Sequence, residues 1–100
     1  MTEPHRIRLR GHWQVTPLDD DRNRHMRRFG RPRTLDVNEH LWVVCAGLPA
    51  DAVVTVNGVL VGSGNCSVDI TEILDLRNEV TIEVPALSTI DEVLLEVRTM

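Results

Sequence analysis

The sequence predicts an all-β protein, an antiparallel β-sandwich of about eight strands with one short helical turn. Three observations support this prediction: short β-branched segments with period-two alternation, turn residues at short intervals, and helical signal in one segment only. The length of 100 residues suits one domain spanning residues 1–100. With 42% apolar and 26% charged residues, the chain has the composition of a folded globular domain.

The clearest element is a hairpin at residues 53–61. β-Branched residues flank Asn57-Gly58, the pair that best tolerates the two positive-φ positions of a type I′ turn. The apolar run 41–46 precedes it and predicts a strand that is buried on at least one side. Alternation at 80–84 stops at Pro85, which cannot donate a hydrogen bond to a sheet, and residues 92–98 form a last strand.

The N-terminal third is also strand-like. Ile7 and Leu9, and then Trp13 and Val15, alternate around Gly11, where we expect a bulge or bend. Residues 25–29 form a further strand, and 17–23 form a polar loop. Residues 69–76 carry the helical signal, because Asp69 can cap a helix whose third residue is Glu72.

Charge is distributed unevenly along the chain. Residues 1–33 hold nine of the eleven arginines and four acids, whereas residues 34–100 hold two arginines and eleven acids. We expect the two segments to pair across a sheet. The alternative, a basic arm that binds nucleic acid, lacks stacking aromatics, since Phe29 alone lies among the arginines 22–33. We therefore expect no nucleic-acid partner.

Motifs for catalysis or metal binding are missing from the sequence. Asp19, Asp21 and Asn23 have calcium-loop spacing, but Arg24 stands where the turn glycine belongs, which indicates a surface turn. The four histidines are scattered, and Cys45 and Cys66 fall on different strands, where we expect reduced, buried thiols. We expect no catalytic residue, no metal and no cofactor, so the chain is not predicted to be an enzyme.

Nothing in the sequence indicates a membrane. The longest apolar stretch, 41–48, is far shorter than the roughly 20 residues of a membrane-spanning helix. The N-terminal ten residues carry several ionisable groups and no apolar run, unlike a signal peptide. We expect a cytoplasmic protein.

An ordered series of motifs resembles the N-terminal sugar-binding domain of glycoside hydrolase family 2, the β-galactosidase and β-glucuronidase family. The resemblance covers about residues 11–84. Its motifs are Trp13, Arg28-Phe29-Gly30-Arg31-Pro32, the strand 41–48, Asn57-Gly58, Val61-Gly62, Asp69-Ile70-Thr71 and the stretch 78–84.

The resemblance implies a jelly-roll, galactose-binding-like sandwich in which Trp13, Val43, Cys45 and Val68 face the core and residues 69–74 form the helical turn. This sequence departs from the family between Gly62 and Asp69, where the family has a long aromatic loop. The catalytic glutamates of the family lie in a separate barrel domain, for which this chain has no room.

Two functions are expected. The first is a non-catalytic carbohydrate-binding-like module with its ligand at an edge formed by Trp42, His40, His12 and Arg28. The alternative is a structural or protein-interaction sandwich that binds no sugar and forms a homodimer. Its self-association face would be the outward side of strand 41–46, namely Trp42, Val44 and Ala46. The chain's own N-terminal arm or the segment 22–33 is the other candidate cover for that face.

Overall fold

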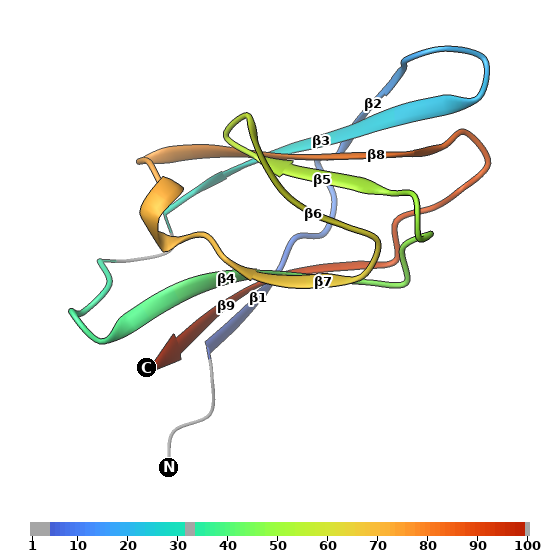
Figure 1. Ribbon diagram of the computed structural model, residues 1–100. Helices are drawn as coiled ribbons and strands as arrows, with labels where there is room; N and C mark the ends of the chain where they lie inside the picture. Colours follow the sequence, from blue (N-terminus) through green and yellow to red (C-terminus); the bar gives the residue numbers. More distant parts are fainter. Residues whose placement is uncertain (1–4, 32–33, 100) are drawn as a thin grey trace.

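The computed structural model describes residues 5–31 and 34–99, and within them nine strands form two antiparallel sheets packed face to face (Figure 1). The first sheet has the order β1 (His5–Arg8), β9 (Glu92–Thr99), β4 (Glu39–Ala46) and β7 (Cys66–Asp69). The second sheet has the order β2 (Gln14–Pro17), β3 (Arg22–Gly30), β8 (Arg77–Pro85), β5 (Val53–Val56) and β6 (Val59–Ser63). The predicted antiparallel β-sandwich is confirmed.

The core lies between the sheets and follows the predicted alternation. Leu41 and Val43 of β4 are fully buried, as are Val54 of β5 and Ile82 of β8. Cys45 faces the same way, and Trp13 and Val68 pack against the core from its margin. The inward positions predicted for these side chains are therefore confirmed.

Local turn chemistry also follows the sequence. Asn57 and Gly58 have φ angles of 52° and 80°, the two positive values that a type I′ turn requires, and Val56 pairs with Val59 on either side. At the predicted bend, Gly11 and His12 have φ angles of 66° and 58°. The bend carries the chain from β1 in the first sheet to β2 in the second.

The segment after β6 differs from expectation. The sequence placed Cys66 on a strand but gave that strand no bounds, and the structure shows it as β7, a four-residue edge strand that pairs with β4. The predicted helix is a single 3₁₀ turn, η1 (Thr71–Ile73), whose N-cap is Ile70 with no side-chain cap bond. Asp69 instead accepts hydrogen bonds from the backbone N–H and the hydroxyl of Thr71, at 2.9 and 2.6 Å. Because Asp69 belongs to β7, the helical turn starts one residue later than the capping pattern indicates.

The two oppositely charged segments pair as predicted. Arg24 and Arg28 of β3 lie directly opposite Glu83 and Glu79 of β8, with N···O distances of 2.9 and 3.8 Å. Arg22 pairs with Asp51 at 3.1 Å. β3 is an interior strand, since β8 pairs with its whole length and β2 pairs with its residues 23–26. Pro32 and Arg33 of this segment lie outside the described residues.

Candidate functional site

The four residues predicted to share a ligand surface lie on opposite sheets. Trp42 and His40 belong to β4 in the first sheet, and Arg28 belongs to β3 in the second. His12, at the bend, lines a small hollow of about 120 Å³ with Arg28. The predicted single surface is therefore wrong: it divides into the pair His12 and Arg28 and the pair His40 and Trp42. The reason is the strand order: the chain leaves the second sheet after β3, which carries Arg28, and re-enters the first sheet as β4, which carries His40 and Trp42.

Trp42 points outward, as predicted, and its own chain covers it. The guanidinium carbon of Arg98 lies 4.2 Å from the centroid of the Trp42 ring, a cation–π geometry. Arg98 also donates to Glu96 at 2.6 Å and to Ser67 at 3.0 Å, and Arg6 donates to the other oxygen of Glu96 at 3.0 Å. Hydrogen bonds from Arg98, and then from Arg6, hold the pKa of Glu96 below its ordinary value despite its burial. Glu96 is thus an ionised anchor for two arginines over this face.

The rest of the self-association face is more open. Val44 is half-buried and Ala46 is exposed, both on the outward side of β4, while Leu94 of β9 lies directly opposite Val44. The expectation that the segment 22–33 covers this face is wrong, because residues 22–30 form β3 in the other sheet. Of the N-terminal arm, residues 5–8 form β1, which pairs with the edge of β9, and the Arg6 side chain reaches Glu96 on this face.

The two cysteines are direct neighbours across β4 and β7. Cys45 is buried, and desolvation, with a smaller effect from Cys66, raises its pKa to about 12. Cys66 is only half-buried, which corrects the prediction that both thiols are buried, and desolvation also raises its pKa. Because the thiolate is the reactive form, neither cysteine has the character of a nucleophile.

One hollow, the end hollow, opens where the bend of residues 9–13 meets the connection between β8 and β9. It has a volume of about 470 Å³. Its walls are Leu9, Arg10, Gly11 and Trp13 from the bend, His25 from β3, and residues 88–91 with Val93 from the β8–β9 side. Its wall therefore combines an aromatic ring, hydroxyls and charged groups of both signs.

The bend that forms the end hollow is held by hydrogen bonds. The indole N–H of Trp13 donates to the carbonyl of Leu9 at 2.9 Å, and Arg27 donates to the carbonyl of Gly11 at 3.0 Å. Within residues 5–31 and 34–99, the side chains of Arg10 and Asp91 form no hydrogen bond or ion pair. Desolvation lowers the pKa of His25, which favours the neutral imidazole. Arg10 and Asp91 are thus free to meet a bound molecule.

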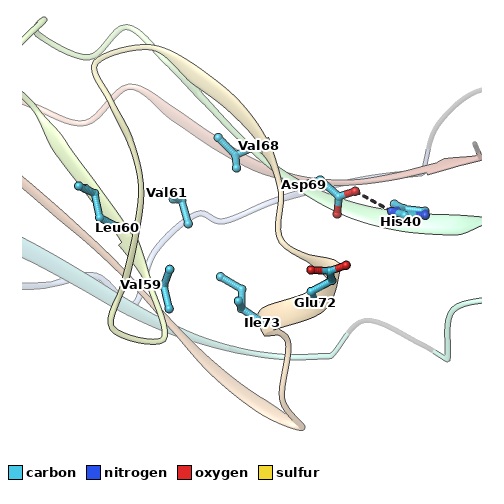
Figure 2. Close-up of a pocket in the computed structure, with 8 residues that line it drawn as sticks. All are labelled: His40, Val59, Leu60, Val61, Val68, Asp69, Glu72 and Ile73. Carbon is cyan, nitrogen blue, oxygen red and sulfur yellow. Dashed lines mark hydrogen bonds and ion pairs between the residues drawn. The ribbon is translucent and has the colours of Figure 1, made fainter.

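A second hollow, the side groove, lies between the edge strands β6 and β7 and is shown in Figure 2. It has a volume of about 460 Å³ and is lined by His40, Val59, Leu60, Val61, Val68, Asp69, Glu72 and Ile73. Aliphatic side chains occupy one end, and the carboxyl groups of Asp69 and Glu72 lie with His40 at the other (Figure 2). The groove therefore has an apolar floor and an acidic end.

A short hydrogen bond orders the acidic end. His40 Nδ1 lies 2.6 Å from Asp69 Oδ2. Burial opposes ionisation of Asp69, but the hydrogen bonds from Thr71 and His40 outweigh it, so the pKa of Asp69 lies below its ordinary value. Asp69 is therefore an ionised carboxylate at neutral pH.

The described residues show neither a cluster of metal ligands nor a membrane-spanning helix. Among the described part of the chain, no group of three or more His, Cys, Asp or Glu side chains is placed to hold a metal ion. None of its helical segments has the length and apolar character needed to cross a bilayer.

Sequence reasoning named no residue of the end hollow as a site residue and placed Trp13 only among the side chains that face the core. Arg10 and Asp91 lie 81 positions apart, and no local pattern connects them. The sequence feature that could have indicated the hollow is Gly11, where a bend was predicted next to Trp13. In the structure this bend brings Trp13 to the wall of the hollow.

Comparisons with known proteins bear on the fold. No family model matches the chain, and no curated protein matches it in sequence. Among solved structures, the chain is similar to an FMN-binding beta-glucuronidase from Facaelibacterium prausnitzii L2-6, with a TM-score of 0.74 and 19% identity. The similarity covers 96% of this chain and 23% of that chain, so the chain spans about a quarter of the length of that enzyme. The chain thus has the β-sandwich fold of one segment of a β-glucuronidase, in agreement with the fold that the resemblance in its sequence motifs implies.

Proposed function

We propose that this chain is a non-catalytic carbohydrate-binding module and that the sugar occupies the end hollow. The observation that carries the proposal is the combination of the Trp13 ring with the unpaired Arg10 and Asp91 side chains in one hollow. The fold shared with a segment of a β-glucuronidase supports a sugar as the ligand class.

The chemistry of the end hollow suits a sugar that carries a carboxylate. An indole ring offers a flat apolar surface with a polar edge, and the edge of Trp13 is already bonded to Leu9. Ser88, Thr89 and Asp91 offer partners for sugar hydroxyls. Arg10 offers a guanidinium, which pairs with carboxylates in bidentate geometry. Glucuronic acid is therefore the first ligand to test.

The same hollow argues against hydrolysis. Glycosidases use two carboxyl groups that flank the scissile bond. In the described part of the chain, Asp91 is the one carboxylate that lines the end hollow. We expect no turnover of a chromogenic glucuronide or galactoside above buffer; turnover that one acid-to-amide substitution abolishes would contradict this.

Titration of the ¹⁵N-labelled chain with glucuronic acid, and with glucose as the neutral control, tests the proposal. Amide signals of residues 9–13 and 88–93 should shift, with tighter binding of glucuronic acid. Arg10→Ala should weaken glucuronic acid binding about tenfold, the equivalent of about 1.4 kcal/mol. Arg77→Ala, at the other end of β8, is the matched control and should bind as the wild type does. Absence of shifts around the hollow, or equal binding by Arg10→Ala, would refute the site.

A second candidate function is self-association through the face of Trp42, Val44 and Ala46. The observation that favours it is the adjacent pair Val44 and Leu94, two apolar side chains on the outer face of a sheet. A two-fold dimer would bury them. Light scattering over a range of concentrations, on wild type, Trp42→Ser and Val44→Lys, tests it. A wild-type protein that stays monomeric at high concentration would exclude the dimer.

A further inference from the structure

The side groove is bounded by two edge strands, and one of them, β6, carries no charged residue or proline that would discourage strand addition. The four edge strands are β1, β7, β2 and β6. β1 carries two arginines, β2 ends at Pro17 and β7 carries Asp69, whereas β6 (Val59–Ser63) has neither charge nor proline. Charges, prolines and bulges are common protectors of edges, and of these β6 has only an irregularity in its register with β5, between Val54 and Thr55, so it is the edge best suited to accept another strand.

Apolar side chains at this edge are open to a partner. Leu60 is 67% exposed and Val59 is 45% exposed, next to Val61 and Ile73 on the groove floor (Figure 2). The floor residues pack against the core from outside it. Every second side chain of a partner strand that pairs with β6 would therefore lie on this apolar surface, which is present before the partner binds.

The other end of the groove carries uncompensated negative charge. Across residues 5–31 and 34–99, the Glu72 side chain has no hydrogen bond or ion pair, and the partners of Asp69 are Thr71 and His40. None of the described arginines lines the groove. A cationic side chain would find two carboxylates there, so the acidic end selects for a basic partner.

We propose that the side groove receives an extended segment of a partner protein, which adds as a strand to the free edge of β6. The segment alternates apolar and polar residues and carries a lysine or arginine that meets Asp69 and Glu72. Backbone hydrogen bonds supply affinity in this mode, and side-chain pockets supply specificity. Since β6 has five residues, the segment has about five residues and a length of about 16 Å. The proposal uses the opposite side of the sandwich from the end hollow and does not depend on sugar binding.

Selection from a phage-displayed library of random nine-residue peptides, on the full chain, tests the proposal without assuming a partner. Enriched peptides should alternate apolar residues and contain a basic residue. Glu72→Arg should lower the binding of a selected peptide at least tenfold. Asp20→Arg makes the same charge change on a distant exposed turn and should leave binding unchanged. An acidic consensus, no enrichment, or equal loss in both variants would overturn the proposal.

The apolar end has its own matched pair of variants. Leu60→Arg should abolish binding of the selected peptide, and Leu87→Arg, at a site that is 99% exposed, should not. Amide signals of residues 59–63 and 68–73 should shift when the peptide is added. If the wild type is instead a dimer that Leu60→Arg alone makes monomeric, the occupant is a second copy and the proposal is wrong.

Discussion

The side chain of Asn57 joins three parts of the molecule, and its removal should have a large effect on stability. Its amide nitrogen donates to the Ile73 carbonyl at 2.8 Å and to the Asn78 side chain at 2.9 Å. Its oxygen accepts from the Glu79 N–H at 2.9 Å. Asn78, 2% exposed, also accepts from the Asp75 N–H at 2.8 Å. The hairpin turn is thereby fastened to η1 and to the start of β8.

The substitution Asn57→Ala removes these bonds and adds backbone strain. Each hydrogen bond contributes about 0.5–1.5 kcal/mol net, and three are lost. Alanine in the left-handed conformation that Asn57 adopts, φ 52°, costs about 1–2 kcal/mol more. Water can reach part of this half-buried site, so we expect a total near the lower end, about 2.5–3 kcal/mol. Asn57→Gly loses the same bonds without the strain and should cost about 1 kcal/mol less than alanine.

Urea unfolding followed by tryptophan fluorescence measures these free energies, and the urea dependence (m) should stay unchanged. For a domain of this size the alanine variant should melt about 10–25 °C lower, since about 1 kcal/mol corresponds to 4–8 °C. An Asn57→Ala variant within about 0.5 kcal/mol of wild type would refute the role of the network. A glycine variant less stable than the alanine variant would refute the strain argument.

Three further predictions concern other parts of the fold. A Cβ at Gly58 meets no atom within 4 Å and φ is 80°, so Gly58→Val should cost about 1–3 kcal/mol through backbone strain alone. Gly58→Asn should cost less in the same melting assay. The pKa of Glu96 is lower in the folded than in the unfolded protein, so its carboxylate stabilises the fold at pH values above the unfolded pKa. This stabilisation is lost as the pH falls through the folded pKa, so Glu96→Gln should flatten the acid limb of a stability–pH curve. If Glu96→Gln leaves the acid limb unchanged, the pairing of Glu96 with Arg6 and Arg98 is not the source of the stability that is lost in acid. Thiol reagents should label half-buried Cys66 slowly at neutral pH and Cys45 more slowly still, as peptide mass spectrometry can measure; rapid labelling of Cys45 would contradict its burial.

The sequence by itself determined the elements whose causes are local. Asn57-Gly58 is a type I′ turn because these two residues accept positive φ at small cost, whatever surrounds them. Because successive side chains of a strand point to opposite faces, Leu41, Val43 and Cys45 share one face and Trp42 lies on the other, and the family resemblance implied that the first set turns inward. The opposite charges of the two halves predicted the pairing of Arg24 with Glu83, since the strands that carry them are neighbours.

The tertiary structure alone decided which strands are neighbours and which residues share a site. The sequence placed Cys66 on a strand, and the tertiary structure decided that this strand, β7, has four residues and pairs with β4. The bend at Gly11 moves the chain into the second sheet, where Arg28 lies, and the chain returns to the first sheet at β4, which carries Trp42. Arg10 and Asp91 line one hollow because β1 pairs with β9, and Val61 and Ile73 line another where the two sheets meet. Hollows form where distant segments fail to fill the space between two layers, and that space is a property of the packed sandwich rather than of any segment of the chain.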